Sequence, residues 1–402
     1  MMAGKYYVRG ILPVAVLLGG LALNVGIGEA HRPITSKYTY NDDIFPIMRD
    51  HCGRCHVPDG VAPMSLMTYK DAFPWGESLR TELIAGHMPP WNAQASPIRF
   101  KNAPTITAAE VDKILVWATG STPQGDPQHV PPPVTLQRDW PMGKPDLILE
   151  LPNTTLASDK SETTEEFTVP TKTTAPKWIS AVDLRPGTPA IVRNATISVK
   201  MDKADSTIIA PERVLEIWVP GEDPVATDDA AFQLAAGAEL VVRVHYLKSY
   251  VNDGKEMSDR SAVGLYFAES ASKQIERLVV SSASVTPTSP VPLTFSQVVD
   301  QDLQALAFSP DPALSNASLQ VDTVSPSGVR TTVIRMAARP NWTRRYWFEQ
   351  PLALPRGTKI EVVAVLNGAD PLLPPSGTPL PAQAVGGSPF RIVFDVVPRP
   401  AL

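Results

Sequence analysis

Leu240-Val241-Val242-Arg243-Val244-His245-Tyr246 is a short run rich in β-branched and apolar residues, and Gly237 lies just before it. Similar short runs, separated by clusters of Pro and Gly, lie at Leu147–Leu151, Ala190–Val199, Gly264–Phe267 and Lys359–Leu366. Short β-rich runs with turn residues between them are typical of all-β domains. The pattern from Pro145 onward predicts two β-sandwiches, at 143–272 and 273–402.

The composition is that of a globular protein. The chain has 402 residues, 43% of them hydrophobic, which is enough for more than one core. Its 36 Lys and Arg against 41 Asp and Glu give a net charge of −5, so no basic surface for nucleic acid is expected. The 42 Pro favour β-domains with many loops over long helices. Only two Cys are present, which excludes a scaffold with several disulfides and a four-Cys zinc site.

Residues 1–30 have the pattern of an export signal. Lys5 and Arg9 precede the apolar stretch Gly10–Leu23, and Gly28-Glu29-Ala30 offers small residues at a cleavage site. The alternative is an uncleaved N-terminal anchor, because the uncharged stretch is about long enough to cross a membrane at ~20 residues. Both readings place the bulk of the chain outside the cytoplasm, in the periplasm of a bacterial host.

The segment Cys52-Gly53-Arg54-Cys55-His56 contains both cysteines of the chain. Two thiols on one helical turn can bond the two vinyl groups of one haem, and the following imidazole can bind its iron. A thioredoxin-like redox pair would need a βαβ context, which the flanking sequence lacks. The motif therefore predicts one covalently attached haem c, with Cys52 and Cys55 as the thioether residues and His56 as the proximal iron ligand.

The distal iron ligand has three candidates after the motif. Met88 stands directly before Pro89, on a stiff, extended stretch that can reach the far face of the haem, and we expect it to be the ligand. Met64 is the first alternative. His87, which would give a lower potential than His/Met ligation, is the second. Core packing is the ordinary role of Met64 and of Met67.

Helix signals flank the haem motif within residues 38–127. Apolar residues at helical spacing begin at Ile44, and Asp42-Asp43 can cap a helix that leads into the motif. Thr107-Ala108-Ala109-Glu110 is a capping box that opens a last helix, Val111–Thr119. These signals predict a small all-α cytochrome c domain at this end of the chain.

The predicted organisation is therefore multidomain. The small all-α cytochrome c domain at 38–127 is followed by a Pro-rich linker at 128–142 and by the two all-β sandwiches. Other sites of chemistry are not evident, because the chain has no Gly-rich phosphate loop and no nucleophile elbow. We name no catalytic residue.

A series of short motifs in fixed order surrounds the haem motif: Tyr40 to Met48, APMSL at 62–66, Thr68-Tyr69, Pro74-Trp75, MPPW at 88–91, and the Trp117 helix with Gly125-Asp126-Pro127 after it. The series resembles the cytochrome c module of a bacterial family. In that family the haem domain precedes a domain similar to copper type II, ascorbate-dependent monooxygenases.

The resemblance continues more weakly into the β-region. Its landmarks there are Arg185-Pro186-Gly187, Val219-Pro220-Gly221, Ala236-Gly237, Leu240–Tyr246 and Leu354–Glu361. The resemblance implies two jelly-roll-like sandwiches with one copper on each of their facing surfaces.

The copper ligands are where this chain departs from that family. Of the six His, only His245 lies beyond residue 130, and it matches a ligand position of the family. The family's paired His falls at Arg193-Asn194 here, its His-Met-His falls at about Asp311-Pro312-Ala313, and no Met follows Met336. Copper in such sites needs imidazoles and a soft Met. The comparison implies that copper and monooxygenase activity have been lost, so no copper is expected and His245 is a hydrogen-bonded remnant.

Arg344 and Arg345 lie among the aromatic residues Trp342, Tyr346 and Trp347. Such a cluster could form a surface for a partner. Packing in a strand with cation–π contacts is the interpretation that we favour.

The sequence thus predicts an exported monohaem c-type cytochrome that transfers electrons to or from redox partner proteins. The degenerate monooxygenase-like β-region would be its scaffold or docking surface. One alternative is a haem-bearing structural subunit of a larger periplasmic or membrane complex. A copper-dependent monooxygenase fed by the haem is a further alternative, which the small number of His disfavours.

Overall fold

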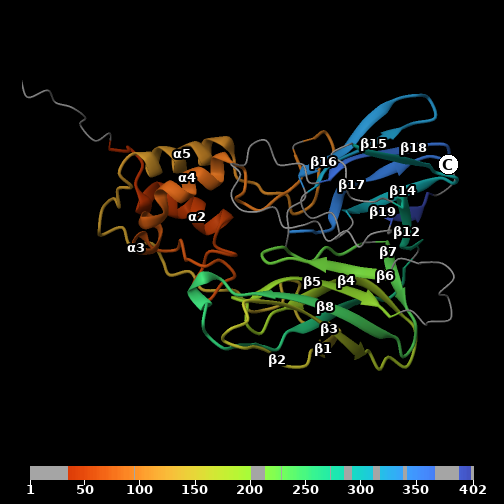
Figure 1. Ribbon diagram of the computed structural model, residues 1–402, viewed down its shortest axis with the longest axis horizontal. Helices are drawn as coiled ribbons and strands as arrows, with labels where there is room; N and C mark the ends of the chain where they lie inside the picture. Colours follow the sequence, from red (N-terminus) through yellow and green to blue (C-terminus); the bar gives the residue numbers. More distant parts are fainter. Residues whose placement is uncertain are drawn as a thin grey trace, which may run out of the picture.

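The computed structural model describes residues 35–94, 96–200, 213–227, 229–271, 273–284, 292–310, 317–337, 342–366 and 389–399. The expected signal at 1–30 and the expected ligand position at Asp311–Ala313 lie outside these residues. Figure 1 shows a helical part at one end of the molecule and two β-sandwiches, one beside the other, at the other end. No helix in the described ranges is long and apolar enough to cross a membrane.

The first sandwich consists of two sheets, with strand orders β1-β10-β4-β7-β11 and β3-β8-β5-β6. Its strands are β1 (Leu147–Glu150), β3 (Glu162–Pro170), β4 (Lys177–Arg185), β5 (Val192–Val199), β6 (Arg213–Trp218), β7 (Ala230–Leu234), β8 (Glu239–Leu247), β10 (Ala262–Ala268) and β11 (Lys273–Gln274). A short ribbon of β2 (Thr154–Leu156) and β9 (Met257–Asp259) lies beside them. Along β8, residues alternate between buried and half-buried, and Val242 and Val244 are fully buried in the core between the sheets.

The second sandwich has strand orders β12-β19-β14-β17 and β13-β18-β15-β16. Its strands are β12 (Glu276–Ser284), β13 (Leu293–Val298), β14 (Leu303–Pro310), β15 (Ala317–Val324), β16 (Arg330–Ala337), β17 (Tyr346–Leu354), β18 (Lys359–Leu366) and β19 (Pro389–Pro398). Buried residues of both sheets, such as Phe308 and Val362, share one core. The expected β-sandwich structure is confirmed, and each of the five β-rich runs in the sequence lies at a strand.

The helical part contains α2 (Phe45–His51), α3 (Tyr69–Ala72), α4 (Gly76–Ile84) and α5 (Ala108–Thr119), with the short helical turns η1 (Tyr40–Ile44) and η2 (Phe73–Trp75). A further turn, η4 (Tyr250–Asn252), belongs to the first sandwich. The capping box of Thr107 and Glu110 is present at the start of α5, as expected. Trp117 on α5 is fully buried beside Tyr40, and their ring centroids lie 6.0 Å apart.

The expected cap at Asp42-Asp43 is wrong in position. The helical stretch begins earlier, at η1, with Thr39 at its N-terminal boundary. Both acidic residues lie inside this first turn, and the Asp43 carboxylate accepts a hydrogen bond from the Thr39 N–H at 2.9 Å. The carboxylates therefore stabilise the start of a helical turn that the spacing had placed after them.

The predicted small all-α cytochrome c domain is wrong as a description of the fold. The protein is mostly β: 42% of the described residues lie in strands and 14% in helices. Helices α2, α4 and α5 have only 7, 9 and 12 residues. Much of the chain between them is loop, and one of these loops belongs to the β-structure.

That loop, residues 92–101, pairs with the second sandwich. Ala93 bridges Met336 on β16, and Phe100 bridges Phe348 on β17. The Gln94 N–H donates to the Arg335 carbonyl at 2.7 Å and the Lys101 N–H to the Trp347 carbonyl at 2.8 Å. Strands β16 and β17 are edge strands of the two facing sheets, and an unpaired edge is costly to leave open. The loop satisfies both edges, which is why the 38–127 region is not a separate helical unit.

Residues 128–142, the expected linker, contain no helix or strand but are packed against the rest of the protein. Val134 and Leu136 contact the helical core. Trp140 is buried, and the Arg185 guanidinium stacks over its ring at 4.8 Å. The segment thus follows the surface from the helices to the first sandwich.

Candidate functional site

The turn after α2 carries both cysteines and the neighbouring histidine. The Cys52 N–H donates to the Met48 carbonyl at 2.9 Å, which continues the helix by one residue. The N–H groups of Cys55 and His56 both donate to the Cys52 carbonyl, at 3.1 and 2.8 Å. Both thiols are free. Two thiols and an imidazole on one hydrogen-bonded turn are the donor set that covalent haem attachment requires.

The His56 ring is held by its own loop. Its Nδ1 lies 3.2 Å from the Met64 carbonyl oxygen, so the ring donates its proton there and Nε2 keeps a lone pair for a metal. The His56 carbonyl accepts from the Leu66 N–H at 3.0 Å, which closes the loop. Burial lowers the pKa of His56, so the ring is neutral at neutral pH. These features fit an imidazole that binds the iron of a haem.

The two thiols are poorly suited to redox exchange. Burial raises the pKa of Cys52 to about 12 and that of Cys55 to about 11. Positive charges of Arg344, Arg54 and Arg193 partly oppose this shift at Cys55. Reactive cysteines have low pKa values, whereas buried thiols of high pKa are inert towards disulfide exchange.

The turn Cys52–His56, called the cysteine turn below, contacts the loop between β6 and β7 of the first sandwich. The Cys55 Sγ lies 4.0 Å from the Pro220 carbonyl oxygen. Arg54 donates to the Gly221 carbonyl at 3.2 Å and forms an ion pair with Asp223 at 2.7 Å. The turn is therefore fixed against the β-structure by a loop far away in sequence.

The expected distal ligand, Met88, lies in the segment that follows α4 and is 37% exposed. Met67 is buried in the helical core near Gly53, which is the packing role considered for it. Met64 contributes its carbonyl to His56 rather than its sulfur.

Only one of the two ring nitrogens of His87 has a hydrogen-bond partner among the described residues. Its Nδ1 lies 2.8 Å from the Glu82 carboxylate. Its Nε2 is buried and has no hydrogen-bond partner in the described part of the chain. His87 therefore retains one ring nitrogen that could bind a metal.

The positions expected for copper lie on β5 and β8. Asn194 and His245 are partners in the antiparallel register, with Asn194 Nδ2 3.5 Å from His245 Nδ1. His245 Nε2 lies 2.8 Å from a Glu162 carboxylate oxygen, although without the alignment of a hydrogen bond. Across the described ranges, no group of three or more His, Cys, Asp or Glu side chains is arranged to hold a metal ion.

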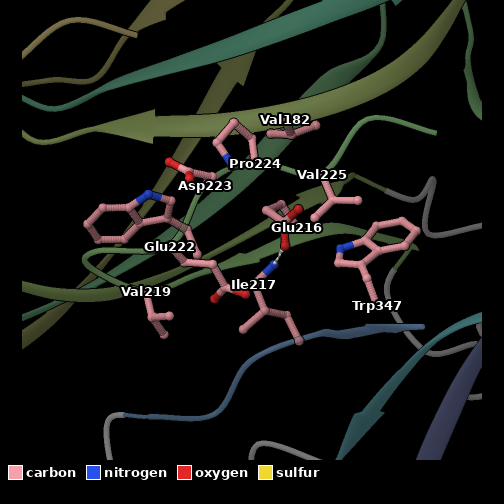
Figure 2. Close-up of a pocket in the computed structure, with 10 residues that line it drawn as sticks. Val182, Glu216, Ile217, Val219, Glu222, Asp223, Pro224, Val225 and Trp347 are labelled. Carbon is pink, nitrogen blue, oxygen red and sulfur yellow. Dashed lines mark hydrogen bonds between the residues drawn. The ribbon is translucent and has the colours of Figure 1, made fainter. Parts of the chain in front are cut away.

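A small cavity of about 20 Å³ lies on the other side of the β6–β7 loop. Figure 2 shows the side chains that line it, among them the acidic Glu216, Glu222 and Asp223 and the aromatic Trp347. Burial raises the pKa of Glu222 to about 7 and also raises that of Glu216. Asp183, which lies near these carboxylates, has a pKa of about 7 for the same reason. These buried acids were missed in the sequence. For Asp183 and Glu216 the available signal was a charge inside a β-rich run, whereas Glu222, in the β6–β7 loop, gave no such signal.

Arginines compensate part of this buried charge. Arg344 lies 3.6 Å from Glu222, and Arg345 lies 2.8 Å from Asp395. The guanidinium of Arg345 also stacks over the Trp347 ring at 5.4 Å. The cation–π contacts expected of this Arg and aromatic cluster are confirmed, but Arg344 and Arg345 lie just before β17 and not within a strand.

Comparisons with known proteins do not assign a family. No family model and no curated protein matches the chain. The VP2 subviral particle of infectious bursal disease virus is 11% identical over 62% of this chain and 70% of its own, with a TM-score of 0.18. A β-porphyranase of glycoside hydrolase family 86 from Bacteroides plebeius is 8% identical over 60% and 35% of the two chains, with a TM-score of 0.14. Pumpkin pro-11S globulin is 7% identical over 64% and 86%, with a TM-score of 0.12. Likeness at this level carries no argument about function.

Proposed function

We propose that this protein is an exported monohaem c-type cytochrome that transfers electrons. One observation carries the proposal: two free thiols lie on one turn with His56, whose Nδ1 is engaged by the Met64 carbonyl so that Nε2 can bind iron. Cys52 and Cys55 would hold the haem, and His56 and Met88 would bind its iron. When bound, the haem would supply reversible uptake and release of one electron.

The residues of this chain would set the conditions for electron transfer. The Met64 carbonyl orients His56, and the contacts of Arg54 with Gly221 and Asp223 fix the turn against the first sandwich. The high thiol pKa values favour haem attachment over a thioredoxin-like role for Cys52 and Cys55. In this proposal the β-region is the scaffold that holds the cysteine turn. A scaffold role fits a copper monooxygenase-like region that has lost its copper ligands.

A second candidate is a haem-bearing structural subunit of a larger periplasmic or membrane complex. It is favoured by the way the helical part is joined to the rest, since residues 92–101 pair with both sheets of the second sandwich. A cysteine turn held firmly against the rest of the protein suits a haem that transfers electrons within a stable complex. Gel filtration of membrane extracts that retain the native complex distinguishes a free carrier from such a subunit.

The test of the proposal is production of the full chain in a bacterium competent in cytochrome c maturation. We expect one iron per chain, haem that stays attached after denaturation, and reversible reduction. Cys52→Ala with Cys55→Ala should abolish attachment, and His56→Ala should greatly reduce it. His129→Ala is the matched control, because this imidazole is 62% exposed and pairs only with Asp42 and nearby acidic charge. Absence of haem from the wild-type chain, in cells that mature another c-type cytochrome, would refute the proposal.

A further inference from the structure

Arg193 sits at a β-bulge in strand β5. In the pairing of β5 with β8, Val192 lies opposite Tyr246 and Asn194 opposite His245, so Arg193 has no partner in the register. An extra residue of this kind turns its side chain away from the regular pleat, and bulges are frequent beside functional sites. The irregularity thus falls on a residue of β5 whose side chain reaches the loop after the cysteine turn.

The Arg193 side chain contacts the loop that holds the histidine. Its Nη1 donates to the Val61 carbonyl at 3.1 Å. The next residue, Ala62, donates its N–H to the Cys55 carbonyl at 3.2 Å, and two residues later the Met64 carbonyl accepts from His56. One guanidinium from the sandwich therefore anchors the loop that meets both Cys55 and His56.

The charge of Arg193 has no acidic partner. Arg54 pairs with Asp223 at 2.7 Å and Arg344 with Glu222 at 3.6 Å. No carboxylate among the described residues lies within ion-pair distance of Arg193, although all three arginines act on Cys55. Burial lowers the pKa of Arg193 to about 10, which leaves it cationic at neutral pH. Of these three arginines, Arg193 is thus the one whose charge has no acidic partner among the described residues.

We propose that Arg193 is a positioning residue for electron transfer, which holds the Val61–Met64 loop against Cys55 and His56 and raises the reduction potential of the haem. The inference rests on the proposed haem function. Reduction adds one electron, supplied by a one-electron donor, and removes one positive charge from the iron. A fixed cation nearby favours the state with less positive charge, so it favours reduction. For a unit charge at a partly buried site we expect an effect of roughly tenfold on the reduction equilibrium.

The experiment measures the midpoint potential of the haem-loaded full chain. We expect Arg193→Gln to lower the equilibrium constant for reduction roughly tenfold. For a one-electron couple this lowers the midpoint potential by about 59 mV. Arg193→Lys keeps the charge and should retain most of the wild-type potential. Arg243→Gln is the matched control, because Arg243 lies on neighbouring strand β8 and its guanidinium pairs with exposed Glu166 at 2.6 Å. This control should leave the potential unchanged.

The outcomes separate the inference from the proposed function. A wild-type chain without covalent haem refutes the function. If haem-loaded Arg193→Gln has the midpoint potential of the wild type, the inference is refuted and the proposed function is not. The inference is also refuted if Arg193→Lys and Arg193→Gln shift the midpoint potential equally, because that result indicates a purely steric role. If Arg193→Gln does not accumulate, Arg193→Met keeps the length of the side chain without its charge and should lower the potential in the same direction. An unchanged potential in that variant also refutes the inference.

Discussion

Gly221, in the loop between β6 and β7, lies directly against Cys55. A Cβ atom built on Gly221 would sit 3.0 Å from the Cys55 Sγ and 3.5 Å from the Arg54 Cβ. The Gly221 backbone also has a φ of +78°, which side chains other than glycine rarely adopt. The closeness of the cysteine turn to the first sandwich therefore depends on the absence of one side chain.

Gly221→Ala should weaken this contact. The variant suffers backbone strain and a steric clash with Cys55, so we expect it to lose about 1–3 kcal/mol more in the free energy of unfolding than its control. The control is Gly237→Ala, at a φ of +67° with nothing within 4 Å of the new Cβ, which suffers the strain alone. Urea denaturation of both chains gives the comparison. Equal losses in the two variants would show that the turn does not press on Gly221.

Asp395→Asn should be strongly destabilising. The side chains of Arg345 and Asp395 are only 2% and 1% exposed and lie 2.8 Å apart. Removal of the Asp395 charge leaves the buried Arg345 guanidinium with Glu216, at 3.9 Å, as its remaining acidic neighbour among the described residues. We expect a loss of about 3–5 kcal/mol in the free energy of unfolding. Glu77→Gln, which breaks the exposed pair with Arg80, should cost under ~1 kcal/mol. Similar losses for the two variants in denaturant titrations would contradict this account.

Asp183→Asn should stabilise the protein, and more so at higher pH. Burial raises the pKa of Asp183 from its ordinary value of 3.8 to about 7, so the folded state holds a proton that the unfolded state releases. The contribution of this carboxyl to stability therefore falls as pH rises from about 4 to about 7 and is constant above. We expect the Asn variant to gain roughly 2–4 kcal/mol at pH 8 and less at pH 5.

The measurement is the free energy of unfolding across this pH range for Asp183→Asn and for Asp112→Asn on the exposed side of α5. The Asp112 variant should follow the wild-type curve. A constant difference between the Asp183 variant and wild type at all pH values would mean that this carboxyl does not titrate in the window.

Met88→Leu should remove the distal iron ligand of the haem-loaded protein. A thioether favours ferrous iron, so the variant should lose the sulfur-to-iron absorption band of the ferric state and show a lower potential. Without haem its stability should change little, because Met88 is 37% exposed. His87→Gln is the competing variant, since His87 Nε2 is buried without a hydrogen-bond partner among the described residues. Loss of the distal ligand in His87→Gln but not in Met88→Leu would assign His87 instead.

The sequence correctly predicted features that depend on residues close together along the chain. Lys359–Leu366 is a strand over its whole expected length, and the capping box of Thr107 and Glu110 opens α5. Both depend on residues close to one another along the chain. The turn of Cys52, Cys55 and His56 has the same origin, because its hydrogen bonds join residues three and four apart.

The failures concern contacts between distant segments. The all-α description of the 38–127 region failed because Ala93 and Phe100 find their partners on β16 and β17, more than two hundred residues away. The buried acids Asp183 and Glu222 could not be recognised either, since they lie among residues distant in sequence, such as Trp218 beside Asp183 and Arg344 beside Glu222.

The sequence by itself determined where the strands lie and which turn carries the two thiols and the imidazole, because periodicity and spacing are local properties. Only the tertiary structure decided that this turn rests on Gly221, that a loop of the helical part pairs with one edge strand of each sheet of the second sandwich, and that Arg193 leaves the pleat to meet Val61. These relationships arise from sheet register and edge pairing, which depend on the energies of many long-range contacts together.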